Sequence, residues 1–219
     1  MATTPTRSAV RRRYARIASI YDRANLEGLL YADARTRAIE LLELRPGARV
    51  LDVACGTGAN FALIEQRIGP TGELVGIDLT PQMLARARAR VLRHRWTNVL
   101  LHEGDVCALP AEELGEPFDA AVCALGLSVI PQWQRAWDAM LALVRPGGRL
   151  ALMDAGYPDS GRRGELVIPR PFAWLLSRLF VADCARRPWR SLERDTDTPV
   201  AETFTWGWVT AAAGAKAAA

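Results

Sequence analysis

The sequence predicts a doubly wound α/β fold with a mostly parallel sheet. Short apolar segments recur between longer amphipathic ones, which is the pattern of strands that alternate with helices. The first apolar segment runs directly into a glycine-rich turn, as happens in sheets that bind a ligand at the carboxyl ends of their strands. A chain of 219 residues with 50% hydrophobic content can bury the core of such a sheet in one domain.

Each element follows from a local pattern. We expect a helical arm at 9–20, a helix over Leu30–Leu44, strands at 48–53, 73–78, 98–103, 118–124 and 148–154, and crossover helices over Thr57–Arg67, Pro81–Arg93 and Gln132–Val144. The whole chain, 1–219, is then a single domain. We divide it into a helical arm or lid (1–45), a cofactor-binding core (46–155), a substrate-side lid with the last strands (156–210) and an alanine-rich flexible tail (211–219).

The turn after the first strand predicts a ligand close to the backbone. Gly56 and Gly58 lack the Cβ atoms that would block a tight turn, and the helix that follows directs its N-terminus at the same place. Asp52, near the end of the strand, would repel the pyrophosphate of a dinucleotide, but it would bind an ammonium group. The predicted ligand is therefore S-adenosylmethionine, whose amino-acid tail carries an ammonium group and whose demethylated product is S-adenosylhomocysteine.

Acidic residues after the next two strands extend this site. Asp78 follows Gly58 by 20 residues and ends the second strand, where an acid reaches the ribose hydroxyls of an adenosine. The segment Gly104, Asp105 and Val106 follows the third strand and offers a carboxylate to the adenine amino group. Three acids at three successive strand ends make a more specific pattern than the glycine turn alone.

With these motifs on 40–155, the chain resembles the seven-stranded, Rossmann-like S-adenosylmethionine-dependent methyltransferases. The resemblance rests on VLDVACGTGAN, VGIDLTPQML, GDVCALP, FDAAVCALGLSVIP and LVRPGGRLALMD. A Tyr-x6-Tyr-Asp segment at 14–22 is similar to the branch that contains ubiquinone/menaquinone-biosynthesis and bacterial phospholipid N-methyltransferases. The resemblance implies an arm that closes over the cofactor, and it adds further cofactor contacts at Tyr21, Ala54, Leu79, Met83, Cys123 and Ala124.

Composition excludes several classes of function. The net charge of +4 comes almost entirely from arginine, with one lysine at position 216, and Arg86, Arg90 and Arg93 recur at helical spacing as a solvated face. Residues 123–127 lack the Asp/Asn-Pro-Pro-aromatic loop that grips a flipped nucleobase, so no nucleic acid partner is expected.

The four cysteines are too widely spaced for a zinc or disulfide framework, so no metal is expected. No segment is apolar for long enough to cross a membrane, and we expect a cytoplasmic protein.

The acceptor is expected to be a hydrophobic or amphipathic small molecule, such as a secondary metabolite, a quinol or a lipid amine. The segments outside the core that should cover the strand ends offer apolar side chains, namely Tyr14, Tyr21, Phe172, Trp174, Leu175 and Leu179. An apolar helix at 171–181 would roof the pocket, or it would touch a membrane beside the basic arm. Direct SN2 transfer needs no obligatory catalytic side chain, and the candidates for orienting or deprotonating the acceptor are Tyr14, Tyr21 and His102.

Two other classes of function stay open. An NAD-dependent oxidoreductase is disfavoured by Asp52 and by Phe61, which stands where a G-x-G-x-x-G motif has its third glycine. A binding or scaffold protein that keeps the cofactor fold without transferring a methyl group is not distinguished by the sequence.

Overall fold

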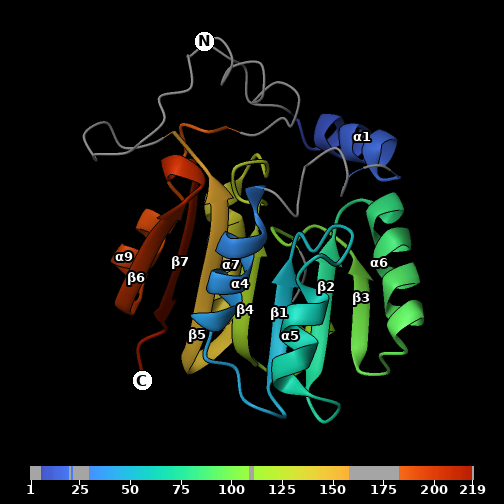
Figure 1. Cartoon of the computed structure of the whole chain (residues 1–219), viewed down its shortest axis with the longest axis horizontal. Coiled ribbons are helices and arrows are strands. Elements are labelled where there is room, and N and C mark those ends of the chain that lie inside the picture. Colours follow the sequence, from blue (N-terminus) through green and yellow to red (C-terminus); the bar gives the residue numbers. More distant parts are fainter. Residues whose placement is uncertain (1–5, 20, 22–29, 109–110, 158–182, 219) are drawn as a thin grey trace.

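The protein, in a computed structural model that describes residues 6–19, 21, 30–108, 111–157 and 183–218, is built around one twisted sheet (Figure 1). The strand order is β3-β2-β1-β4-β5-β7-β6. The strands are β1 Arg49–Val53, β2 Glu73–Asp78, β3 Val99–Glu103, β4 Phe118–Ala124, β5 Val144–Ala155, β6 Asp197–Phe204 and β7 Val209–Ala215. The first five strands are parallel, and β7 runs antiparallel to both β5 and β6. The expected doubly wound, seven-stranded and mostly parallel sheet is thereby confirmed.

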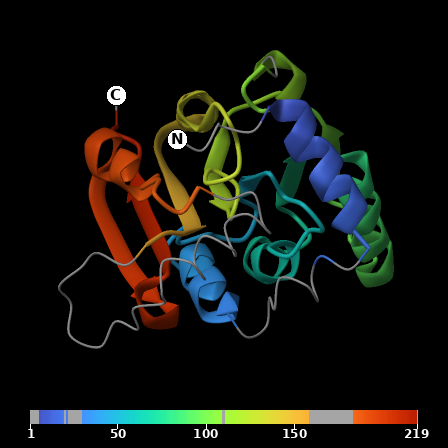
Figure 2. The same cartoon turned by 90° about the horizontal axis from the view of Figure 1, so that it is seen from above.

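Helices cover both faces of the sheet. Helices α4 (Ala32–Glu40), α5 (Phe61–Ile68) and α6 (Pro81–His94) lie on one face, and α7 (Trp133–Leu143) and α9 (Trp189–Asp195) lie on the other (Figure 1). Helix α1 (Arg7–Ile17) lies above the carboxyl ends of the strands and beside α6 (Figure 2). Two 3-10 turns, η1 (Ala111–Leu114) and η2 (Thr205–Gly207), complete the described elements.

The central strands form the core because their side chains are apolar on both faces. Leu51 and Val53 of β1 face the layer of Trp137, whereas Val50 faces the layer of Phe61, and all five side chains are fully buried. Such near-continuous apolar strands are typical of a parallel sheet covered by helices on both sides. This rigid core holds the carboxyl ends of the strands in fixed positions relative to one another.

The expected helix over Thr57–Arg67 begins later than predicted, at Phe61. The backbone of residues 54–60 forms turns instead, with positive φ angles at Ala54, Gly56 and Gly58 that a helix cannot contain. Helix α6 begins at Pro81, as expected. Strand β5 begins at Val144, four residues before its predicted start at 148, because Val144 already pairs with Phe118.

The prediction of a flexible tail at 211–219 is wrong. Residues Val209–Ala215 form β7, which lies inside the sheet, and Ala211, Ala212 and Ala213 are at most 1% exposed. Alanine has a low strand propensity, but its small side chain lets α4 pack closely on one face of β7 while α9 packs on the other. Tertiary packing therefore decides the structure of this segment. Within the described part of the chain, no helix has the length and apolarity needed to span a bilayer.

Candidate active site

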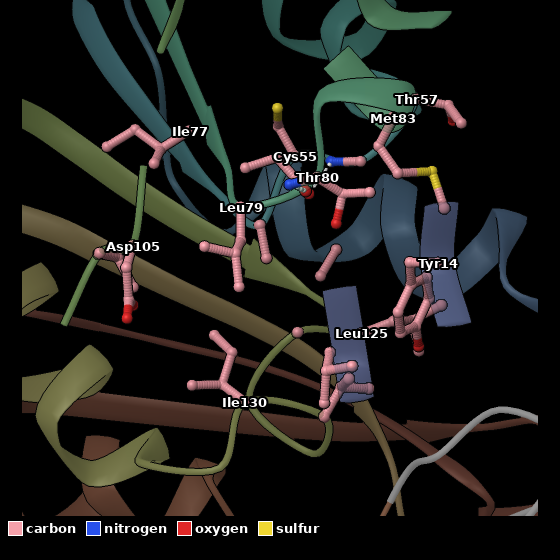
Figure 3. Close-up of a pocket in the computed structure, with 18 of the residues that line it drawn as sticks. Tyr14, Cys55, Thr57, Ile77, Leu79, Thr80, Met83, Asp105, Leu125 and Ile130 are labelled. Carbon is pink, nitrogen blue, oxygen red and sulfur yellow. Dashed lines mark hydrogen bonds between the residues drawn. The ribbon is translucent and has the colours of Figure 1, made fainter. Parts of the chain in front are cut away.

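A cavity of about 290 Å³ opens at the carboxyl ends of the parallel strands (Figure 3). It lies where the strand order reverses, because β1 pairs with β2 on one side and with β4 on the other. Ligands in doubly wound sheets bind at this crevice. Of the residues predicted for the site, eleven line the cavity: Tyr14, Tyr21, Ala54, Gly56, Asp78, Leu79, Met83, Gly104, Asp105, Val106 and Ala124. Asp52, Gly58, Cys123 and His102 do not.

The glycine turn shapes the cavity floor, and its two glycines do different things. Gly56 lines the cavity with φ +57°, and an added Cβ there would meet only the carbonyl oxygen of Ala54, at 3.9 Å. Gly58, with φ +77°, lies outside the cavity, and an added Cβ would come within 2.6 Å of the Phe61 ring. Gly58 therefore serves the packing of Phe61 under the turn, while Gly56 lets the backbone face the cavity.

Asp52 lies one layer behind the cavity wall. Its Oδ1 accepts a hydrogen bond of 2.9 Å from Asn60 Nδ2, and Asn60 Oδ1 accepts one from Arg35 of α4. The other carboxylate oxygen, Oδ2, is buried with no hydrogen-bond partner. Burial raises the pKa of Asp52 to about 7, against the opposing effects of Asn60 and Arg35. Asn60 and Arg35 both line the cavity. Asp52 therefore acts on a ligand from behind, by its charge and by the orientation that it gives to the Asn60 amide.

Asp78 is the last residue of β2, and its carboxylate accepts hydrogen bonds from the glycine turn after β1 and from the turn before α6. Its Oδ2 accepts the N–H of Gly56 at 2.9 Å, and its Oδ1 accepts the N–H of Thr80 at 2.8 Å. Burial raises the pKa of this carboxyl although these bonds act to lower it. Thr80 occupies the N-cap position of α6, but its side chain makes no capping bond to the helix. Each carboxylate oxygen retains acceptor capacity toward the cavity.

Asp105 connects the third strand end to the helical arm. Its Oδ1 accepts the N–H of Cys107 at 3.0 Å, and its Oδ2 forms an ion pair of 2.8 Å with Nε of Arg7 in α1. Arg11 of α1 forms a longer pair, 3.5 Å, with Glu103. Helix α1 is thus held over the cavity by charge, and Arg7 and Val10 become part of the lining.

Of the three residues predicted to orient or deprotonate the acceptor, the two tyrosines line the cavity and the histidine does not. Tyr14 and Tyr21 both line the cavity, with ring centroids 5.8 Å apart, and burial raises the pKa of Tyr14 well above its ordinary value. His102 lies in β3 opposite Ile77 and is not part of the lining. Cys123 is buried beneath Gly126, where an added Cβ would lie 2.5 Å from its sulfur. The lid residues Phe172, Trp174, Leu175 and Leu179 are outside the described residues.

Sequence reasoning missed two parts of the site. Arg35 and Asn60 bring polar groups to the cavity. Asn60 ends the motif VLDVACGTGAN, a signal that could have found it, whereas nothing in the sequence around Arg35 distinguishes it from a surface residue. The second part is the loop after β4, from Leu125 to Gln132, which forms an apolar wall through Leu125, Val129, Ile130 and Pro131. Leu125, like Ala54 after β1, has a positive φ, 58° and 54° respectively. Such conformations in residues other than glycine are rare and concentrate at functional sites.

Comparison with known proteins gives the same picture. Residues 50–148 match a family described as "Methyltransferase domain". The chain is 30% identical over 148 residues to a demethylmenaquinone methyltransferase of Listeria monocytogenes, a match covering 67% of this chain and 62% of that protein. It is 34% identical over 149 residues to a 2-phytyl-1,4-naphtoquinone methyltransferase of Thermosynechococcus vestitus, covering 67% and 64%. The chain therefore spans a little under two thirds of these relatives.

A solved structure agrees with the fold over nearly the whole chain. The N-methyltransferase NodS from Bradyrhizobium japonicum, in complex with S-adenosylhomocysteine, has a TM-score of 0.69 and 19% sequence identity. The match covers 94% of this chain and 98% of that one. The expected resemblance to Rossmann-like methyltransferases is thus confirmed at the level of the domain and of the fold.

Proposed function

We propose that this chain, of which residues 50–148 match a methyltransferase domain, is an S-adenosylmethionine-dependent methyltransferase acting on an apolar or amphipathic small molecule. The single observation that carries the proposal is the placement of three acids around one cavity at the topological switch point. Asp78 and Asp105 line the cavity, and Asp52 lies behind Asn60. An oxidoreductase that binds a dinucleotide would have to place its pyrophosphate among these carboxylates.

The residues present fit the cofactor. Asp52, which lies behind Asn60, places a negative charge close to the ammonium group of the methionine tail, and Arg35, which lines the cavity beside Asn60, suits the carboxylate of the same tail. The free acceptor capacity of Asp78 suits the ribose hydroxyls, and Asp105 suits the adenine amino group. In this arrangement Gly56, Leu79 and Met83 surround the nucleoside, and Ala54 and Ala124 lie near the tail.

When bound, the cofactor supplies a methyl group that its sulfonium charge already activates. The chain's own task is to align the acceptor and to exclude water, effects that contribute several kcal/mol in oriented reactions. Helix α1 covers the cavity, and the apolar wall after β4 faces Tyr14 and Tyr21 across it. The tyrosine hydroxyls can orient a polar atom of the acceptor, and no further residue is assigned as a base.

The apolar wall supports the acceptor class. Val10 of the arm and Val129, Ile130 and Pro131 of the loop after β4 offer no charge to a polar substrate. Two of the relatives described above are named for methylation of quinones. A quinol, a lipid amine or a comparable secondary metabolite fits such a wall, whereas a small polar acid or amine does not.

We also propose that the edge of the molecule bearing the cavity can rest on an anionic membrane. Helices α1 and α6 lie side by side and are joined by a hydrogen bond from Arg86 to the carbonyl of Ser19. Exposed arginines lie on α1 at positions 11, 12 and 16 and in the first half of α6 at position 86, which is the half nearer the cavity. Trp206 of η2 is 60% exposed and lies at the same edge of the sheet. Arginines and tryptophan are the side chains that bind lipid headgroups.

For the compartment, we propose the cytoplasm. The cysteines at 55, 107, 123 and 184 are all free thiols, which suits a reducing environment.

Two experiments test these proposals. Calorimetry with S-adenosylmethionine, S-adenosylhomocysteine and NAD should show binding of the first two only. Incubation of the protein and cofactor with a metabolite extract should then yield an apolar compound heavier by one methylene group, detected by mass spectrometry. Cofactor binding without any methylated product would favour a binding protein, and methylation of small polar substrates alone would contradict the acceptor class.

The membrane proposal has its own test. Vesicles with anionic lipid should bind the protein and release it as salt rises, and replacement of Arg11, Arg12 and Arg16 by serine should abolish binding. Replacing Arg190 and Arg194 of α9 by serine is the matched control. Equal binding of both variants would contradict the assignment of this edge.

A further inference from the structure

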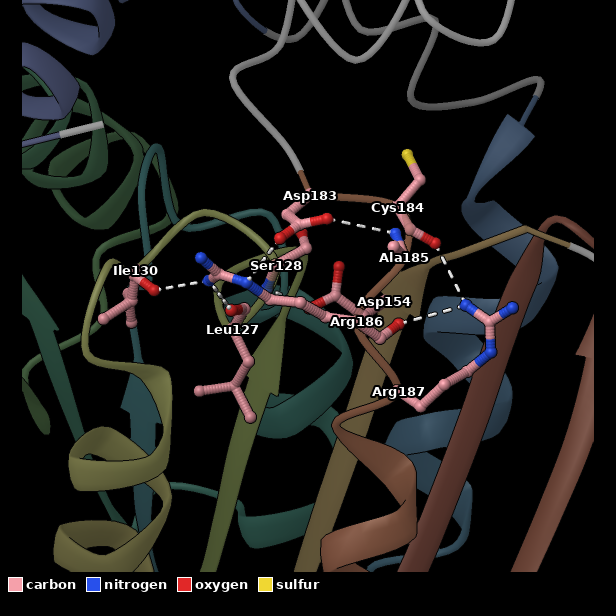
Figure 4. A network of polar contacts seen from close by, with 9 residues as sticks. All are labelled: Leu127, Ser128, Ile130, Asp154, Asp183, Cys184, Ala185, Arg186 and Arg187. Atoms are coloured by element: carbon pink, nitrogen blue, oxygen red, sulfur yellow. Dashed lines mark hydrogen bonds and ion pairs between the residues drawn. The ribbon is translucent and has the colours of Figure 1, made fainter. Parts of the chain in front are cut away.

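The apolar wall of the cavity has no regular secondary structure of its own. Between β4 and α7, the loop from Leu125 to Gln132 makes only two internal backbone bonds, both to the carbonyl of Gly126, from the N–H groups of Val129 and Ile130. Such a loop would not keep a fixed shape by itself, because its other polar backbone groups need partners. Several of these partners come from Asp154 and from the residues 183–187, none of which lines the cavity (Figure 4).

The first partner is Asp154, near the carboxyl end of β5. Its side chain is fully buried, and its Oδ2 accepts the N–H of Ser128 at 2.8 Å. Its Oδ1 accepts the N–H of Ala155 at 2.9 Å, so the carboxylate is fixed to its own strand. The wall is thereby linked to β5, an interior strand of the sheet that pairs with both β4 and β7.

The second partner is the turn formed by Asp183–Arg187. The guanidinium of Arg186 donates from Nη1 to the carbonyl oxygens of Leu127, at 3.0 Å, and Ile130, at 2.6 Å. The N–H of Asp183 donates to the carbonyl of Ser128 at 2.9 Å. The side chain of Arg186 is only 10% exposed and is aligned by an ion pair of 3.2 Å with the carboxylate of Asp183.

This turn is itself anchored to β5. Arg187 donates to the carbonyl of Tyr157 at 2.7 Å and to that of Cys184 at 3.0 Å. The N–H of Tyr157 returns a bond of 2.9 Å to the carbonyl of Cys184. The result is a continuous connection from the end of β5 through the 183–187 turn to three residues of the wall, Leu127, Ser128 and Ile130.

We propose that Arg186 and Asp154 are positioning residues that hold the acceptor wall of the cavity in the shape that binds the acceptor. The inference rests on the proposed function only in naming the ligand of this wall as the acceptor. Neither residue lines the cavity, so each acts through the backbone of Leu127, Ser128 and Ile130. The cofactor contacts proposed at Asp78, Asp105 and Arg35 lie on other loops and on α4. Loss of these positioning residues should therefore weaken binding of the acceptor and leave binding of the cofactor unchanged.

The test uses Arg186→Met and Arg186→Lys in the full chain, with Arg190→Met as the matched control. Arg190 is an exposed arginine of α9, four residues away in sequence. Arg186→Met removes both donors, and we expect the acceptor KM to rise about tenfold while the dissociation constant of S-adenosylhomocysteine changes less than twofold. Arg186→Lys keeps the charge without the planar fork and should give an intermediate KM. The control should match the wild type.

A second measurement does not depend on turnover. Hydrogen exchange of the peptide covering 125–132 should be faster in Arg186→Met than in the wild type, with no change over β1. If Arg186→Met folds poorly, Asp183→Ala, which removes the aligning partner of Arg186 together with the acceptor of the Ala185 N–H, should show the same changes on a smaller scale. Unchanged exchange in the wall would overturn the inference, as would equal effects on acceptor and cofactor. If the wild-type protein methylates no acceptor, the proposed function is contradicted. The hydrogen-exchange data would still test whether Arg186 and Asp154 hold the wall.

Discussion

Replacing Asp52 by asparagine should stabilise the protein at alkaline pH and weaken its affinity for the cofactor. The carboxyl of Asp52 is fully buried, and this burial raises its pKa from the ordinary 3.8 to about 7. Between these two values the folded protein keeps a proton on Asp52 that the unfolded chain has lost. The free energy of unfolding must then fall as the pH rises through this interval, and it stays at the lower level above it.

The size of the effect follows from the shift. It spans about three pKa units, and each unit corresponds to about 1.4 kcal/mol, so ionisation of Asp52 removes about 4 kcal/mol of stability between acid and alkaline pH. Asparagine cannot ionise, but its oxygen can still accept the hydrogen bond from Asn60. The variant should therefore lack this decline. Asp154, whose pKa is raised to about 6 by burial, contributes equally to both proteins and cancels in the comparison.

The assay is urea denaturation of both proteins, without cofactor, at a series of pH values from 5 to 8. Asp119→Asn is the control whose titration lies outside this range. Burial alone would raise the pKa of Asp119, but the N–H of Arg49 and the guanidinium of Arg145 outweigh it and lower this pKa from the ordinary 3.8. The stability contributed by Asp119 is lost only as the pH falls below that ordinary value, so the curve of Asp119→Asn should run parallel to that of the wild type between pH 5 and 8. Parallel curves for the wild type and Asp52→Asn would refute the reasoning.

The same variant should bind S-adenosylmethionine about 1–3 kcal/mol more weakly, because the negative charge behind Asn60 that attracts the ammonium group is lost. Gain of stability together with loss of affinity is expected where a buried charge is kept for a ligand. Calorimetry at pH 8 measures this loss directly. Unchanged affinity would mean that Asn60 alone holds the tail.

Three further predictions concern other parts of the structure. Asp78→Ala should weaken binding of S-adenosylhomocysteine by about 1–3 kcal/mol in calorimetry, since the ribose hydroxyls lose a charged acceptor, and equal affinity would contradict the ribose assignment. Gly58→Ala should cost about 1–3 kcal/mol in urea denaturation, because its φ is positive and the new Cβ overlaps the Phe61 ring, and a smaller side chain at position 61 should restore part of the loss. A chain ending at residue 210 should fail to give a cooperative unfolding transition, because β7 lies inside the sheet, and normal folding would mean that β5 can end the sheet.

Much of the core was predictable because each parallel strand is apolar throughout and ends in a recognisable turn. The bounds of β2 and β4 are those expected, and β1 and β3 each begin one residue later than expected. Local signals decide these elements, since glycine permits the positive φ angles that the turn after β1 needs and Pro81 fixes φ at the start of α6. Asp78 and Asp105 reach the cavity for the same reason, because their positions follow directly from the ends of β2 and β3.

The rest depends on contacts between distant parts of the chain. Arg35 reaches the cavity only because α4 packs across β5 and β7, a geometry that leaves no mark on the sequence around it. Asp52 was predicted as a direct ligand, yet Asn60 lies between it and the cavity, because α5 begins only at Phe61. His102 is the second-last residue of β3 and pairs with Ile77, which lines the cavity, but His102 itself is not part of the lining.

The position of β7 has a consequence for synthesis of the chain on the ribosome. Strand β6 leaves the ribosome before β7, yet in the sheet it pairs only with β7, which separates it from β5. The five parallel strands can associate while β6 still has no partner, so the edge of β5 is open during translation. An open edge of this kind can pair with the same edge of another nascent chain. Slow translation over residues 197–208 should therefore promote aggregation, whereas rapid completion of β7 should prevent it.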